Sequence, residues 1–92
     1  MILNLGNGVL VPEKEIIGIF DLDITSQSYR TRQYLQEAEE RGHMEYVDIQ
    51  ELPKSFVVCA RPGEGQRVIL SPLSPQTLQR RLEGGGLSAG GL

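Results

Sequence analysis

The chain has 92 residues, of which 39% are hydrophobic and 23% are charged, and its net charge at pH 7 is −3. This length and composition favour one folded soluble domain and argue against two separate cores or a disordered chain. The acidic balance argues against a uniformly basic nucleic-acid-binding surface, although it is compatible with a local basic patch.

The cysteine content and the apolar patterning indicate a cytoplasmic protein. No apolar run approaches the roughly 18 residues that a membrane-spanning helix needs, and the N-terminus lacks the basic start of a signal peptide. Cys59 is the single cysteine, so no intrachain disulfide is possible and a reducing compartment fits. We expect one domain over residues 1–83, followed by a flexible glycine-rich tail over residues 84–92.

The N-terminal half predicts a hairpin and then a strand. Two short apolar segments flank Gly6-Asn7-Gly8, and an Asn-Gly pair favours a tight turn because both residues tolerate positive φ. Residues 15–22 follow as a strand, in which Gly18 predicts a bulge or the close approach of another group. Strict alternation of side chains would place apolar residues on both faces of this strand: Ile17 and Ile19 on one, and Ile16, Phe20 and Leu22 on the other.

A helix and three strands are predicted next. Residues 28–41 read as a helix ended by Gly42, and a short strand is expected within residues 44–49. Residues 55–60 are apolar on both faces, which is typical of a central strand. Residues 61–66 then connect this strand to the next one as a hairpin.

The stretch from Arg67 to Leu82 combines a strand with an amphipathic helix. Pro72 ends the strand, while Ser74 can cap a helix whose first residue is Pro75. The apolar face of that helix carries leucines four residues apart, Leu78 and Leu82.

These elements predict an α+β fold: a small, mostly antiparallel sheet with one central helix and a short C-terminal helix. If both helices cover a single face of the sheet, the other face or an edge stays exposed to water, which is unfavourable for large aliphatic side chains. We therefore expect a homo-oligomer. The alternative is that the sheet curls on itself and covers both faces.

No residue set of the sequence completes a catalytic or metal site. Asp21 and Asp23 share a strand end, but no third carboxylate or nearby histidine completes a coordination set. Cys59 and His43 are a potential nucleophile–base dyad, yet the Cys59 thiol lies in an apolar strand, where cysteines are usually unreactive packing residues. We expect no enzymatic activity, no metal, no cofactor and no small-molecule ligand.

Two arginine pairs are candidates for phosphate contacts. Arg30 and Arg32 lie near the N-terminus of a predicted helix, where the positive end of the helix dipole repels cations. A phosphate or a partner carboxylate at this end would relieve that repulsion. The alternative is that both side chains turn into solvent at small cost. Arg80 and Arg81 either bind phosphate or act only as favourable cations at a helix C-terminus.

Four segments in the same order carry a family resemblance. They are LGNGVLV at residues 5–11, EIIGIFD at 15–21, KSFVV at 54–58 and ILSPLSPQTL at 69–78. Together they resemble the bacterial extracellular matrix regulators RemA and RemB, with the closer likeness to the RemB branch, also called YaaB. The resemblance implies a small cytoplasmic α+β domain that is not an enzyme. It also implies a DNA-binding regulator of biofilm matrix genes, in a family whose RemA branch assembles into rings that present arginines to DNA.

The chain departs from the RemA branch at the basic positions. Neighbouring arginines precede the strand at residues 55–60 in that branch, whereas this chain has Glu51-Leu52-Pro53 and then Lys54. Another basic position of the branch corresponds to Glu15. The expected DNA-contacting residues are therefore Lys54, Arg61, Arg67, Arg80 and Arg81, followed by Arg30 and Arg32.

Two functional hypotheses remain at this point. The first is an oligomeric DNA-binding transcription regulator that contacts mainly phosphates, so that its affinity falls steeply with salt. The second is an oligomeric protein-interaction partner that has lost direct DNA contact, which the acidic balance and Glu51-Leu52-Pro53 favour.

Overall fold

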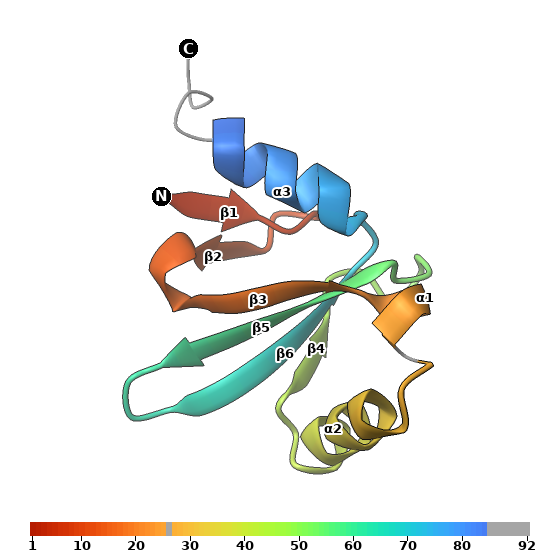
Figure 1. Ribbon diagram of the computed structural model, residues 1–92. Helices are drawn as coiled ribbons and strands as arrows, with labels where there is room; N and C mark the ends of the chain where they lie inside the picture. Colours follow the sequence, from red (N-terminus) through yellow and green to blue (C-terminus); the bar gives the residue numbers. More distant parts are fainter. Residues whose placement is uncertain (26, 85–92) are drawn as a thin grey trace.

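A computed structural model describes residues 1–25 and 27–84 and confirms the predicted α+β class (Figure 1). The predicted tail therefore lies outside the described residues, apart from Gly84, at which the last helix ends. The elements in chain order are β1 (Ile2–Asn4), β2 (Leu10–Pro12), the 3-10 turn η1 (Glu13–Glu15), β3 (Ile16–Asp21), α1 (Leu22–Thr25), α2 (Tyr29–Glu40), β4 (Met44–Tyr46), β5 (Ser55–Arg61), β6 (Gly65–Ser71) and α3 (Pro75–Gly84). In the part of the chain that is described, no helix has the length and apolar character needed to cross a bilayer.

The main sheet has four strands in the order β3-β5-β6-β4, and β1 pairs with β2 in a separate two-stranded sheet. The neighbours β3, β5 and β6 are antiparallel, whereas β4 is parallel to β6. The predicted central strand is β5, whose residues Phe56, Val57, Val58 and Cys59 are all buried. β3 and β4 are consequently the two edges of the sheet.

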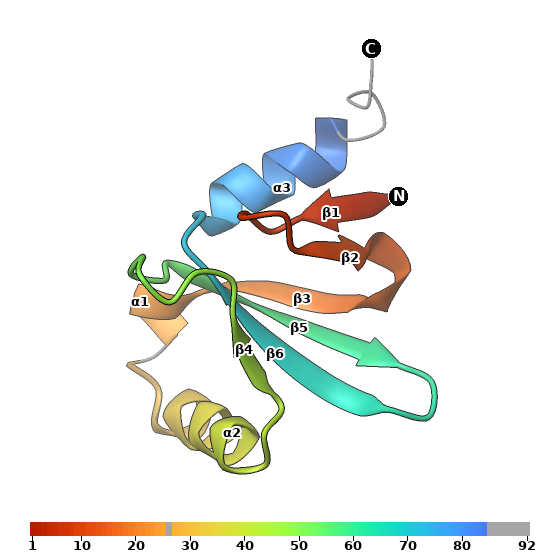
Figure 2. The same cartoon turned by 180° about the vertical axis from the view of Figure 1, so that it is seen from behind.

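One face of this sheet is covered by the β1–β2 hairpin together with α3 (Figure 1 and Figure 2). We call it the closed face. The sheet contributes Val57, Cys59 and Ile69 to its core, and the covering elements contribute Leu3, Leu5, Val11 and Leu78. The hydroxyl of Ser71, itself fully buried, donates to the carbonyl of Leu5 at 2.7 Å and accepts from the amide of Leu73 at 3.0 Å. This serine therefore ties β1 to the turn that leads into α3.

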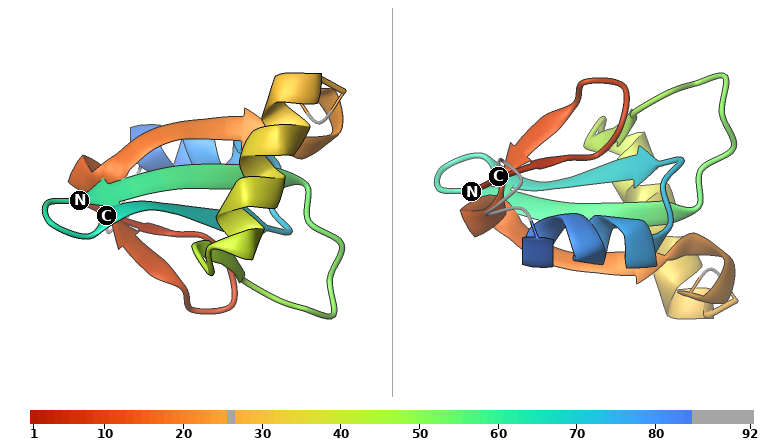
Figure 3. Two further views of the ribbon diagram at one scale, coloured as in Figure 1. Left: turned by 90° about the horizontal axis from the view of Figure 1, so that it is seen from below. Right: turned by 90° about the horizontal axis from the view of Figure 1, so that it is seen from above.

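The other face is covered mainly by α2, with Leu22 of α1 also packing on it, and we call it the open face. Ala38 and Leu35 of α2 pack on Phe56, Val58, Val68 and Leu70 of the sheet. Figure 3 shows that α2 crosses the strands near one end, so that their other end, toward the β5–β6 turn, lies outside the helix. The helices therefore lie on opposite faces, so the arrangement with both on a single face, from which a homo-oligomer was expected, does not occur.

Local signals in the sequence place most element boundaries. The turn residues Gly6, Asn7 and Gly8 all have positive φ, as a tight hairpin requires. Ser28 caps α2 by accepting from the amide of Thr31, and Gly42 with φ +74° follows its end. Ser74 caps α3 by accepting from the amide of Thr77 at 3.1 Å.

A bulge in β3 overturns the side-chain alternation predicted for this strand. Its pairing with β5 shifts between Ile16 and Gly18, so Ile17 is an extra residue. Ile16 and Ile19 consequently both pack on the closed face, whereas Ile17 and Phe20 face the open side. The end of the predicted strand also forms α1, whose amide at Ile24 is capped by the Asp21 carboxylate at 3.0 Å.

Candidate functional site

Two of the predicted DNA-contacting arginines are held by carboxylates at the β5–β6 hairpin. Arg67 forms a two-pronged contact with Glu45 of β4, with both hydrogen bonds at 2.9 Å. Arg61 contacts Glu15 in the same way at 3.2 and 3.3 Å, and its second ion pair reaches Glu64 at 3.5 Å. The hydrogen bond to Glu15, followed by the charges of Glu15 and Glu64, raises the pKa of Arg61. A phosphate at either arginine would compete with a carboxylate already in place.

The two arginines of α3 differ in their contacts. Arg81 donates through Nη1 to the backbone carbonyl of Asn4 at 2.8 Å, so its head group fastens α3 to β1. Arg80 lies beside it on the exposed side of the helix, where Gln76, Gln79 and Glu83 line the same shallow depression. Of this pair, Arg80 therefore presents its charge to solvent.

The remaining predicted cations lie elsewhere in the fold. Lys54 is exposed at the start of β5, where its backbone bonds to Ser71 and Leu22. Arg30 and Arg32 are exposed in the first turn of α2, and Arg32 donates through Nη1 to the carbonyl of Gln27 at 3.1 Å. Within one chain the predicted DNA-contacting residues are thus distributed over the hairpin, α3, the start of β5 and the start of α2.

The open face carries a site that the sequence did not reveal. An apolar groove of about 420 Å³, which we call the β3 groove, lies between β3 and α2. Its lining includes Ile17, Phe20, Phe56 and Val58 from the sheet and Arg30 and Tyr34 from α2. The rings of Phe20 and Phe56 stack with their centroids 5.0 Å apart. Ile17 is 58% exposed, which is unusual for isoleucine in a strand.

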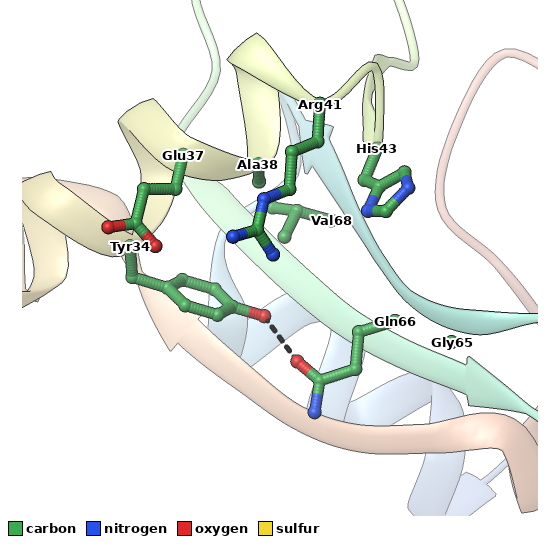
Figure 4. Close-up of a pocket in the computed structure, with 8 residues that line it drawn as sticks. All are labelled: Tyr34, Glu37, Ala38, Arg41, His43, Gly65, Gln66 and Val68. Carbon is green, nitrogen blue, oxygen red and sulfur yellow. Dashed lines mark hydrogen bonds between the residues drawn. The ribbon is translucent and has the colours of Figure 1, made fainter.

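Tyr34 separates the β3 groove from a more polar pocket of about 310 Å³ (Figure 4). Its hydroxyl donates to Oε1 of Gln66 at 2.8 Å, so the ring bridges α2 and β6. Burial raises the pKa of this phenol. In Figure 4, Arg41, the residue that follows α2, extends over Val68 on one side of the bridge, with His43 next to it.

The potential catalytic pair of His43 and Cys59 does not come together. Cys59 points into the core of the closed face, whereas His43 lines the polar pocket on the open face. Burial is the main cause that raises the pKa of the Cys59 thiol, and the nearby Arg67 lowers it by less. Within residues 1–25 and 27–84 no group of three or more His, Cys, Asp or Glu is placed to hold a metal ion.

Residues 2–82 match the RemA-like family, described as extracellular matrix regulatory protein A-like. The chain belongs to the RemA-like family. The match runs from β1 to the last turn of α3, so it includes both layers that cover the sheet. The family is one of regulatory proteins and not of enzymes. No curated protein matches the chain.

Glu15 and Glu51, at which the chain differs from the basic positions expected from the RemA branch, have different surroundings in the structure. Glu15 has a side chain only 12% exposed and is occupied with Arg61. Glu51 belongs to the β4–β5 loop, residues 47–54, in which Ile49 and Leu52 are 85% and 84% exposed. Glu15 therefore forms an ion pair within the chain, and Glu51 lies on a protruding loop with exposed apolar residues.

The sequence does not predict the β3 groove, because the lining of this groove depends on the bulge. Alternation without a bulge separates Ile17 from Phe20, and only the extra residue brings them to one face. Gly18 was the available signal. A Cβ at this position would lie 2.7 Å from the Phe20 ring, so the glycine makes room for the floor of the groove.

Proposed function

We propose that this member of the RemA-like family is a DNA-binding transcription regulator of extracellular matrix genes that acts as an oligomer in the cytoplasm. The observation that carries the proposal is the match of residues 2–82 to a family of extracellular matrix regulatory proteins. Within the family we place the chain nearer to RemB, on the basis of IIGIFD at residues 16–21 and the segment from Ile69 to Arg81.

Phosphate contacts by Arg80 and Lys54 suit this role best. Both are exposed, and no carboxylate pairs with them among residues 1–25 and 27–84. Arg61 and Arg67 are less available because each already contacts a glutamate. Since a single chain carries a net charge of −3, an oligomer that repeats the same few cations along DNA would be needed for useful affinity.

A DNA titration at several salt concentrations tests the proposal. The slope of log K against log salt reports the number of phosphates neutralised, and removing one contact reduces it by about 0.9. We expect Arg80→Ala to weaken binding and to lower the slope by at least that amount. The matched control is Arg67→Ala, which removes a guanidinium already neutralised by Glu45 and should change the slope less. Absence of binding at low salt would refute the proposal.

The second candidate is an oligomeric interaction partner without direct DNA contact. The pairing of Arg61 with Glu15 and of Arg67 with Glu45 favours it, because it removes two cations from the surface. Light scattering that shows a stable oligomer, combined with a negative DNA titration in the same buffer, would support this candidate over the first.

A further inference from the structure

Two exposed apolar features lie toward opposite edges of the main sheet. The β3 groove adjoins the edge strand β3, with Ile17 58% and Phe20 38% exposed. The β4–β5 loop leaves the other edge strand, β4, and Figure 3 shows it extending beyond the sheet on the side away from β3. One feature is concave and the other protrudes.

The loop is held in a defined shape although its apolar side chains point outward. Val47, at its start, is buried, and its carbonyl accepts from Nδ2 of Asn7 at 3.1 Å. The Asp48 carboxylate accepts from the amide of Gln50 at 2.9 Å, and the amide of Glu51 reaches the carbonyl of Asp48 at 3.3 Å. The loop is therefore a preorganised protrusion, which lowers the entropy lost when its side chains become fixed on binding.

The charges of the two features are complementary. The loop carries Asp48 and Glu51 next to its exposed apolar residues. Arg30 lines the β3 groove from the first turn of α2, where the helix dipole makes a lone cation unfavourable. Among residues 1–25 and 27–84, no ion pair is formed by Arg30 or Glu51. A carboxylate brought to Arg30 would relieve its conflict with the dipole.

We propose that the β4–β5 loop of one copy docks into the β3 groove of a second copy, with Ile49 and Leu52 against Ile17 and Phe20 and with Glu51 facing Arg30. The inference rests on the self-association part of the proposed function and not on DNA binding. The two surfaces are different, so the contact is heterologous: each copy has a free groove and a free loop after pairing, and the contact repeats.

A second copy is the occupant that the chain itself favours. Docking a foreign peptide in the groove would leave Ile49 and Leu52 in water, whereas self-docking covers both exposed apolar surfaces at once. The same contact joins Glu51 of the loop to Arg30 at the groove. One interaction thus accounts for the apolar and the charged features of both surfaces.

Light scattering on the full chain over a range of concentrations tests the contact. We expect the unmodified chain to form oligomers, and expect two variants to require at least about tenfold higher concentration for assembly, since they remove central apolar contacts. One variant is Ile49→Ser with Leu52→Ser, in the loop, and the other is Ile17→Ser, in the groove. Leu10→Ser, at a 59% exposed leucine of β2 outside both surfaces, is the matched control and should assemble normally.

Mixing the two variants gives the most specific result. The loop variant keeps an intact groove and the Ile17→Ser variant keeps an intact loop, so an equimolar mixture should form heterodimers and no larger species. The charge pair offers an independent route: Glu51→Arg and Arg30→Glu should each weaken assembly, and their combination in one chain should restore it.

Three results would overturn the inference. They are a monomeric unmodified chain, normal assembly of the loop variant, and a mixture that forms no heterodimer while circular dichroism shows both variants folded. A groove variant that fails to assemble beside a loop variant that assembles normally would assign the groove to another occupant. If the unmodified chain assembles but does not bind DNA at low salt, the DNA part of the proposed function is refuted and this contact stands.

Discussion

The closed and open faces of the same sheet are covered to different extents. On the closed face, Leu3, Leu5, Ile69 and Leu78 are between 0% and 2% exposed, and two covering elements meet over them. On the open face, α2 contributes Ala38 as its only buried residue, and a groove and a pocket remain beside it. The difference shows that the closed face is shielded from water more completely, whereas the open face leaves exposed apolar surface beside α2.

The largest expected effect is on the rate at which the Cys59 thiol, buried under the closed face, is alkylated. Alkylation should be about 10³-fold slower or more in the folded protein than in denaturant, because attack requires an opening that costs roughly 5 kcal/mol or more. The raised pKa adds a pH dependence. Stability is unaffected below the pKa of the unfolded thiol and falls as the pH rises through the higher folded value, because the thiolate favours the unfolded chain. Alkylation rates with and without denaturant check the burial of the thiol, and urea denaturation at several pH values checks the fall in stability. Fast labelling of the folded protein would contradict the first point.

Truncating Leu78 compares the two faces directly. Leu78→Ala should lower the free energy of unfolding by about 2–5 kcal/mol, because it leaves a cavity at a fully buried position. Ile17→Ala on the open face should change it by no more than about 0.5 kcal/mol. Urea denaturation, at concentrations below those at which the chain associates, measures both values. Equal losses at the two positions would mean that Ile17 is buried as well as Leu78 is, and would contradict its exposure in the β3 groove.

Removing the Ser71 hydroxyl tests how the closed face is fastened. Ser71→Ala leaves the carbonyl of Leu5 and the amide of Leu73 without their partner, at a cost of about 1–3 kcal/mol. Ser55→Ala is the control, since it removes a single hydrogen bond, to the carbonyl of Leu73. Thermal unfolding should therefore show a larger decrease of Tm for Ser71→Ala. The reverse order would argue against the double role of Ser71.

The smallest expected effect concerns the Glu45–Arg67 pair at the sheet edge. Both side chains are partly exposed, at 48% and 31%, so the pair should contribute only about 0.2–1 kcal/mol. A double-mutant cycle with Glu45→Gln and Arg67→Gln gives the coupling energy. A value well above 1 kcal/mol would mean that solvent weakens the pair less than its exposure indicates.

The features of the fold that were predicted correctly depend on neighbouring residues. Ser28, Ser74 and Gly42 bound their helices because caps act within one turn of the chain. The parallel pairing of β4 with β6 and the placement of α2 and α3 on opposite faces were not predicted. Both depend on contacts between distant segments, which local patterns do not encode.

The site was predicted less well for the same reason. Arg61 and Arg67 were expected to be free for DNA, but the glutamates that each binds in a two-pronged contact lie 46 and 22 residues away in the chain. Arg80, by contrast, is exposed beside the helix face formed by Leu78 and Leu82, as the helical spacing indicated. DNA contact by any of these residues stays a prediction.

The bulge in β3 also affects how the protein avoids aggregation. β3 is an edge strand with an apolar sequence, and such edges tend to pair with strands of other molecules in an open-ended way. An unpaired extra residue at Ile17 interrupts the regular row of amide and carbonyl groups along that edge. Growth of a continuous intermolecular sheet is thereby disfavoured, and the bulge protects against fibril formation at a strand that has to remain hydrophobic.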